Sequence, residues 1–178
     1  MKNVLIAYAT WAGSTHEIAE EIAKTLRKKS FHVDINSTNE VQTLSDYNAL
    51  ILGTSIHAGQ TVRGFRKFIR KYYEVLQEKP IALFVSCANM MEDTEENRAE
   101  TMEWLKKAIK GYEELQPISI GLFAGATLTT GEDFDNLNFL VRKLIIAMEK
   151  NMINNFGKSD FRDFEKIRLW ADQLAKVF

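Results

Sequence analysis

Short apolar runs alternate with segments of helical periodicity along this chain, and this alternation predicts strands that take turns with helices. Apolar runs of this length are typical of strands buried in a sheet. They lie at residues 4–9, 31–35, 49–53, 81–85 and 117–125. Apolar residues recur at helical spacing at residues 18–26, 65–76, 94–110 and 161–177. Such an order predicts a parallel sheet with helices on both faces.

The predicted elements are consistent with a three-layer α/β sandwich. Five parallel strands with a ligand loop after the first fit the strand order 2-1-3-4-5. In this order the loops after strands one, three and four meet in one crevice at the carboxyl edge of the sheet. We predict a single domain over residues 1–178, with a helical insertion at about residues 127–160 after the last strand.

The loop after the first strand combines hydroxyl side chains with a glycine. Its residues are Thr10, Trp11, Ala12, Gly13, Ser14 and Thr15. The free N–H groups of the following helix and its dipole favour an anion there, and the hydroxyls add donors. The loop lacks the Gly-Lys-Ser/Thr ending of a P-loop and the G-x-G-x-x-G of a Rossmann-type dinucleotide site. A phosphate site is therefore predicted, with a capped helix start that binds nothing as the alternative.

Composition narrows the class of protein. The chain has 178 residues, 46% of them hydrophobic, and a net charge of -1, so no nucleic-acid partner is predicted. A lone cysteine, Cys87, excludes an internal disulfide and a cysteine-based zinc site, and no metal is predicted. The first apolar run is too short for a signal sequence or a membrane span, so we expect a cytoplasmic protein.

Two loops carry a resemblance to a known family. The pattern T-x-x-G-S-T at residues 10–15 resembles the FMN phosphate loop of flavodoxins. Residues 52–59, Leu-Gly-Thr-Ser-Ile-His-Ala-Gly, look like the second loop of the menaquinone-dependent protoporphyrinogen IX dehydrogenase branch. Shorter matches at residues 84–86, 124–128 and 163–171 extend the resemblance over nearly the whole chain. His57 and Ala58 depart from it, because an Arg-Tyr pair is usual there.

The resemblance implies a non-covalent FMN and an oxidoreductase that oxidises a porphyrinogen and passes electrons to a quinone. The chemistry would reside in the flavin, so the catalytic residue stays unassigned, with His57 as a weak candidate. The alternative is a flavodoxin-type electron-transfer protein without a small-molecule substrate. Such carriers are typically strongly acidic, whereas this chain is near neutral.

The resemblance also implies three sets of FMN-binding residues. The loop Thr10–Thr15 would hold the phosphate. One side of the isoalloxazine would meet Ser55, Ile56, His57, Ala58 and Gly59, and its other edge Ser86, Cys87, Ala88, Asn89 and Met90. Backbone groups near Ala58 would face flavin N5, and Asn89 would bind the pyrimidine. Trp11 and His57 are alternative stacking partners, and Cys87 is expected to serve packing.

The insertion has an apolar surface wider than one stripe, with basic flanks. Its apolar residues at helical spacing are Leu137, Leu140, Val141, Leu144, Ile145 and Met148. One interpretation is packing on the sheet or in a homodimer interface. The other is a flap over the flavin that meets a lipid-soluble quinone or the cytoplasmic face of the membrane, as amphipathic helices do. The resemblance favours the second.

Overall fold

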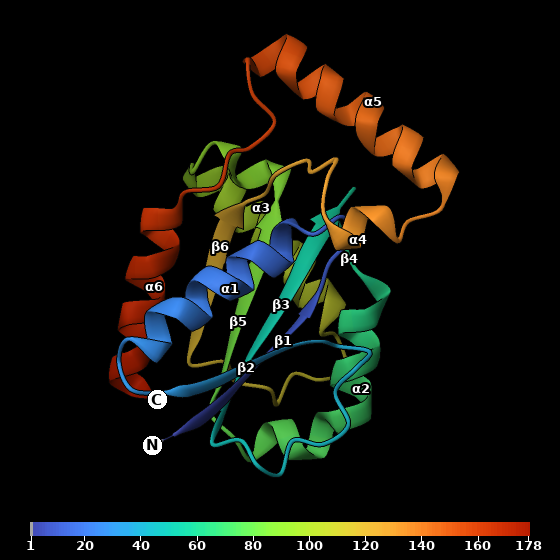
Figure 1. The fold of residues 1–178 in the computed structure, drawn as a ribbon. Helices are drawn as coiled ribbons and strands as arrows, with labels where there is room; N and C mark the ends of the chain where they lie inside the picture. The colour runs from blue at the N-terminus through green and yellow to red at the C-terminus, as the bar shows by residue number, and fades with distance from the viewer. Residues whose placement is uncertain (1) are drawn as a thin grey trace.

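The computed structural model describes residues 2–178 and shows a sheet between two layers of helices (Figure 1). Within this part of the chain the sheet has six strands. Five are parallel, in the order β2-β1-β3-β5-β6. When only these parallel strands are numbered, this is the predicted order 2-1-3-4-5, which is thereby confirmed. Their bounds are β1 Asn3–Ala9, β2 His32–Ser37, β3 Ala49–His57, β5 Ile81–Cys87 and β6 Ser119–Ala124.

The remaining strand, β4, was not predicted. It spans Gln60–Thr61 and pairs antiparallel with the end of β3. Two residues are too short a segment for a period-of-two pattern to reveal. The strand matters because it turns the end of β3 into a hairpin at the carboxyl edge of the sheet.

Two apolar clusters fill the space between the sheet and the helices. Successive residues of a strand point to opposite faces. Val4 and Ile6 of β1 therefore pack with α1 (Ser14–Arg27) and α6 (Phe164–Val177). Leu5 and Ala7 pack instead with α2 (Arg63–Gln77) and α3 (Glu95–Ala108).

Capping residues set the helix boundaries more narrowly than hydrophobic spacing did. The Thr94 side chain accepts a hydrogen bond from the Asn97 N–H, so α3 begins at Glu95. Asp163 caps α6 in the same way by accepting from the Lys166 N–H. α6 therefore begins later than the predicted residue 161.

The insertion between β6 and α6 forms two helices, α4 (Glu132–Asp135) and α5 (Phe139–Phe156). In Figure 1, α5 projects beyond the carboxyl ends of the strands and does not lie along the sheet. Ile145 is buried, whereas Phe139 is 65% exposed and Leu140 76%. Within residues 2–178, no helix combines the length and apolar character needed to cross a membrane.

Candidate functional site

A cavity of about 350 Å³ opens at the carboxyl edge of the sheet, where the predicted loops converge. Trp11 and Ser14 come from the loop after β1, residues 55–58 from the end of β3, and residues 86–88 from the end of β5. All three loops that the strand order was expected to bring together therefore line one space. The remaining lining residues are Met91, Gly125, Ala126, Thr127, Met148, Met152 and Phe161.

The loop after β1 is held in shape by its own hydroxyls. Gly13 has a φ of +92°, a conformation that glycine adopts without strain, and it precedes α1 directly. The Gly13 N–H donates to Thr10 Oγ1 at 2.9 Å. Ser14 lines the cavity, while the buried Thr15 lies behind it with its Oγ1 2.9 Å from Ser86 Oγ. The start of α1 thus faces the cavity with the Ser14 side chain.

Ser55 carries the clearest sign of a missing ligand. Its side chain is buried, lines the cavity, and its Oγ has no hydrogen-bond partner among the described residues. An unsatisfied buried hydroxyl costs about 1–3 kcal/mol, so such atoms are uncommon in native structures. A polar ligand in the cavity would satisfy it. The hydroxyl-lined loop and this free hydroxyl together fit a phosphorylated ligand with polar edges, as FMN is.

The β3–β4 hairpin forms the next wall of the site. Its two loop residues, Ala58 and Gly59, both have positive φ, +47° and +73°. Two positive values in a two-residue hairpin loop are typical of a type I′ turn. A Cβ placed on Gly59 would lie 3.1 Å from Trp104 Nε1, so α3 supports the turn from outside the cavity. Of the two turn residues, Ala58 lines the cavity, whereas Gly59 packs against Trp104 and is not among the lining residues.

Trp11 and His57, the two predicted stacking candidates, contact each other. Their ring centroids are 4.6 Å apart and the planes meet at 63°, an edge-to-face arrangement, and both line the cavity. The His57 side chain is exposed on one side, but loss of water on the other lowers its pKa below the usual value. Burial therefore favours the neutral form of His57.

At the end of β5, Cys87 lines the cavity, but Asn89 and Met90 do not. Cys87 lines the cavity, and burial raises the pKa of its thiol, which keeps the thiol protonated and supports a packing role. Asn89 and Met90 lie beside the cavity. The Asn89 amide donates to the Asn97 carbonyl oxygen at 3.1 Å and so anchors α3, and Met90 is buried in the core. The predicted bond from Asn89 to the pyrimidine stays a prediction.

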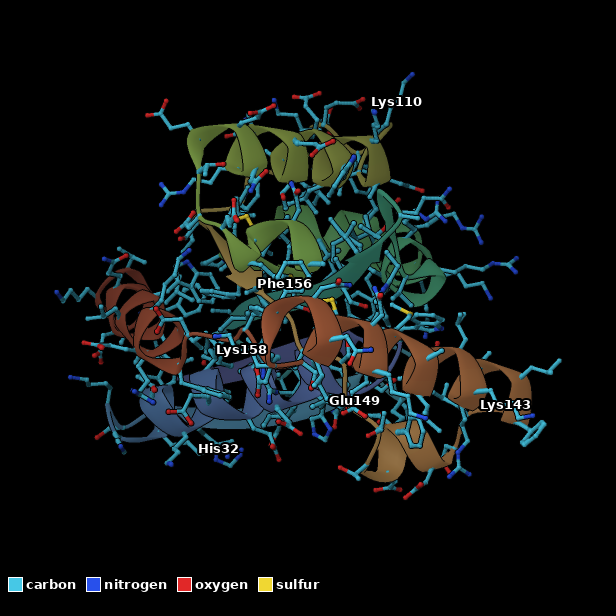
Figure 2. The ribbon with its side chains drawn as sticks, turned by 90° about the horizontal axis from the view of Figure 1, so that it is seen from above. His32, Lys110, Lys143, Glu149, Phe156 and Lys158 are labelled. Atoms are coloured by element: carbon cyan, nitrogen blue, oxygen red, sulfur yellow. The ribbon has the colours of Figure 1, made fainter. Side chains whose placement is uncertain are left out.

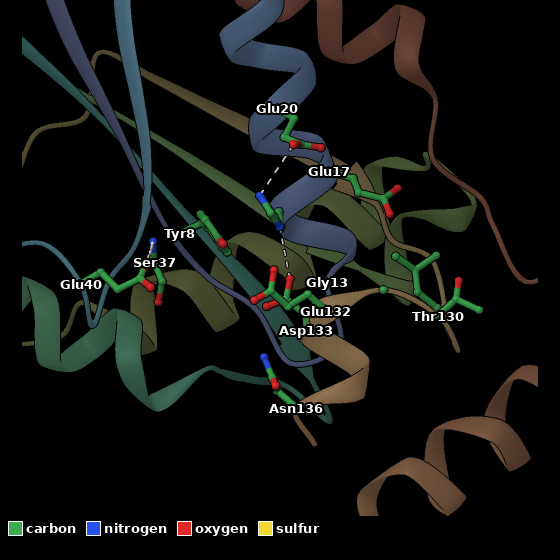
Figure 3. Close-up of a pocket in the computed structure, with 13 residues that line it drawn as sticks. Tyr8, Gly13, Glu17, Glu20, Ser37, Glu40, Thr130, Glu132, Asp133 and Asn136 are labelled. Atoms are coloured by element: carbon green, nitrogen blue, oxygen red, sulfur yellow. Dashed lines mark hydrogen bonds and ion pairs between the residues drawn. The ribbon is translucent and has the colours of Figure 1, made fainter. Parts of the chain in front are cut away.

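The outer side of the first loop borders an acidic hollow (Figure 3). Glu17 and Glu20 of α1 face Glu132 and Asp133 of α4 across it. Burial, Asp133 and the other nearby carboxylates raise the pKa of Tyr8 to about 12. Negative charge on this side disfavours a phosphate there, so the cavity side of the loop is the one suited to an anion.

The insertion contributes one wall of the cavity, and hydrophobic spacing alone did not identify which of its residues form that wall. Met148 and Met152 of α5 reach the cavity, and Phe161, which precedes α6, lies beside them. The segment is tied down where the Thr127 N–H donates to the Ser159 carbonyl oxygen at 2.9 Å. Met148 and Met152 are four residues apart, a spacing that places both on one helix face. That spacing was the available signal, but it did not say which face meets the cofactor site.

The geometry agrees with a known family. A protein-family model described as "Flavodoxin domain" matches residues 5–159, which is most of the chain. The chain belongs to the flavodoxin family. Two curated relatives are named protoporphyrinogen IX dehydrogenase [quinone]. The one from Escherichia coli is 23% identical, covering 97% of this chain and 94% of its own. The one from Leishmania major is 29% identical, covering 97% of this chain and 74% of its own.

Solved structures share the flavodoxin fold. A Streptococcus pneumoniae flavodoxin is 16% identical with a TM-score of 0.55, and the match covers 99% of each chain. A Lactobacillus acidophilus flavoprotein in complex with FMN is 12% identical with a TM-score of 0.51, over 68% of this chain and 93% of its own. Membership of the family and the fit of the cavity support FMN as the cofactor of this flavodoxin-family protein.

Proposed function

We propose that this protein is an FMN-dependent oxidoreductase that oxidises a porphyrinogen and passes the electrons to a quinone. One observation carries the proposal: the cavity combines the free Ser55 hydroxyl with an apolar wall from α5. A flavin and an apolar substrate need these two surfaces next to each other. The names of the curated relatives support an oxidoreductase with a quinone acceptor.

The residues have distinct parts in this proposal. The loop Thr10–Thr15 and the start of α1 hold the phosphate by neutral hydrogen bonds and the helix dipole, since the loop contains no lysine or arginine. Ser55 and the Ala58–Gly59 turn orient the ring, and Trp11 with His57 covers it at the open side. Bound FMN supplies the two-electron chemistry. A neutral His57 keeps positive charge away from the ring.

The exposed side of α5 is the proposed contact with the quinone and the membrane. Phe139 and Leu140 are largely exposed, as is Leu144 at 51%. Lys143 lies over the Phe139 ring, 4.5 Å from its centroid, and Arg142 precedes it. Apolar residues beside cations suit a helix at an anionic lipid surface. Further along α5, Met148 and Met152 line the cavity, so the same helix joins this contact to the cavity. The cytoplasmic face of the membrane is the proposed location.

Two measurements test the proposal in sequence. The first is the visible spectrum of the purified protein with and without added FMN, and a protein that never takes up FMN contradicts it. The second is anaerobic mixing of the FMN-loaded protein with protoporphyrinogen IX, followed by a menaquinone analogue. We expect bleaching by the first compound and recovery of the absorbance with the second. Flavin that the porphyrinogen does not bleach would refute the substrate.

A flavodoxin-type electron-transfer protein is the second candidate. The exposure of His57 and Ala58 at the open side of the cavity favours it, because one-electron exchange between proteins needs the ring edge at the surface. A reductive titration separates the two functions. Two well-separated one-electron steps, with no turnover of porphyrinogen, would support the carrier.

A further inference from the structure

A second hollow, of about 370 Å³, lies at the start of α2 and next to the cofactor cavity. Its walls come from the end of β1, the segment after β2, and the first turns of α2. Trp11 lines both spaces, so the two adjoin at this residue. The residues used below are Thr38, Arg63, Gly64, Lys67 and Asp133.

Thr38 lines this hollow and has a buried hydroxyl. The residue is only 8% exposed, and its Oγ1 has no hydrogen-bond partner in the described part of the chain. A Cβ placed on Gly64 would lie 2.9 Å from Thr38 Oγ1, so the hydroxyl faces the start of α2. Like Ser55, Thr38 has a buried polar atom that a ligand would satisfy.

The start of α2 offers donors to the same hollow. α2 has 15 residues, its N-cap position is Val62, and no described side chain caps it. Its first turn contains no acidic residue and begins instead with Arg63. Free N–H groups and the positive end of the helix dipole attract an anion. A cation at this end is unfavourable for the helix alone and becomes favourable once an anion is bound.

Two cationic side chains line the hollow, and further cations lie beyond it. Arg63 and Lys67 line it and also line an adjoining groove of about 360 Å³. That groove adds Arg66, Arg70, Lys107 and Lys110. Figure 2 shows Lys110 at the end of α3, on the side where α2 lies. Within residues 2–178, no ion pair joins these six cations to an acidic side chain.

This concentration of charge is unusual for a chain whose net charge is -1. Residues 63, 66, 67 and 70 share one face of α2, and like charges at these spacings destabilise a helix. One carboxylate, Asp133, also lines the hollow. Its Oδ2 lies 3.3 Å from His16 Nδ1, so it is turned towards α1, and the cations around α2 outnumber it.

We propose that this hollow binds a phosphate group of a small molecule, with the adjoining groove holding a second phosphate of the same molecule. The Thr38 hydroxyl and the N–H groups of α2 would donate to the first phosphate, and Arg63 and Lys67 would neutralise it. A diphosphate-bearing molecule is favoured over a membrane, because Thr38 is only 8% exposed and a flat surface does not reach its hydroxyl. The proposal does not depend on the substrate of the flavin.

Pyrophosphate is the probe that tests this site, in calorimetric titrations of the protein with and without bound FMN at low salt. We expect binding in both states. Arg63→Gln with Lys67→Gln should weaken it about tenfold or more, and Thr38→Val about threefold to tenfold. The control, Lys24→Gln with Lys176→Gln, removes two charges from the opposite face and should leave affinity unchanged.

Several results would overturn the proposal. One is an equal loss of pyrophosphate affinity in the control variant, and another is competition between FMN and pyrophosphate for the protein. The third is a protein that does not bind pyrophosphate and binds only to vesicles that contain phosphatidylglycerol. Thermal unfolding guards against a folding defect. Thr38→Val should melt at or above the temperature of the unmodified protein without pyrophosphate, since it removes an unsatisfied hydroxyl. It should also lose most of the increase that pyrophosphate gives the unmodified protein.

Discussion

The hydroxyl oxygens of Thr15 and Ser86 lie 2.9 Å apart in the buried interior, and this hydrogen bond ties the start of α1 to the end of β5. Both residues come from loops that the sequence assigned to FMN. Their side chains point at each other behind Ser14, so they hold two walls of the cavity at a set distance.

Breaking this bond should loosen the site. We expect Thr15→Val to destabilise the protein by about 1–2 kcal/mol, because it leaves Ser86 Oγ buried and unpaired. Ser86→Ala should have a similar effect, and the double variant should cost less than the sum of the two. Urea unfolding of the FMN-free protein measures these values. Strict additivity would contradict a direct hydrogen bond.

Replacing Ser55 by alanine should lower the affinity for FMN without lowering the stability of the FMN-free protein. Ser55→Ala removes an unsatisfied hydroxyl, so the FMN-free protein should be as stable as the unmodified one or up to about 1 kcal/mol more stable. FMN affinity should fall about fivefold or more, as for a lost hydrogen bond. Thr61→Val is the matched control, because Thr61 Oγ1 is also buried and unpaired but does not line the cavity. A loss of FMN affinity in the control would weaken the assignment.

The two turn residues of the β3–β4 hairpin should respond oppositely to exchange of their side chains. Ala58→Gly should stabilise the protein by up to about 1 kcal/mol, since glycine adopts a positive φ without strain. Gly59→Ala should destabilise it by about 1 kcal/mol or more, since the new Cβ also meets Trp104. Thermal unfolding of both variants measures these changes in stability. Destabilisation by Ala58→Gly would show that the alanine side chain contributes packing.

The stability of the FMN-free protein should fall as the pH falls below about 6.5, the unperturbed value for histidine. Burial lowers the pKa of His57 in the folded state, so the unfolded state takes up this proton first and is favoured. The decline should level off once the pH is below the folded-state pKa. His57→Asn should lose this part of the pH dependence. Urea unfolding of the unmodified protein and of His57→Asn between pH 8 and 5 measures this difference. If the free energies of unfolding of the two proteins change in parallel with pH, the lowered pKa of His57 is contradicted.

Membrane contact through α5 is testable by vesicle flotation. Leu140→Ser with Leu144→Ser should reduce the fraction of protein that floats with anionic vesicles, because both side chains are exposed and apolar. Leu169→Ser with Val177→Ser is the matched control. These residues of α6 are 57% and 62% exposed and lie on a different element. Equal flotation of all three proteins would sink the membrane proposal.

Hydrophobic patterning by itself determined the layered fold of this protein. The runs that became β1, β3 and β5 are buried on both faces, and helices must cover a sheet of that kind. The strand order then placed three loops at one edge, and the structure shows them lining one cavity. The loop Thr10–Thr15 was recognisable because it depends on local chemistry, a glycine with hydroxyls before a helix.

Only the tertiary structure decided which side chains face the site. Thr15 and Asn89 look like Ser14 in polarity, yet they bond within the protein, because the partners Ser86 and Asn97 are brought to them by folding. The direction of α5 was equally inaccessible, since an apolar surface wider than one stripe does not identify the face that packs. The hydroxyls of Ser55 and Thr38, which have no hydrogen-bond partner within residues 2–178, are the clearest examples. A missing partner is a property of the surrounding space, and no sequence position carries it alone.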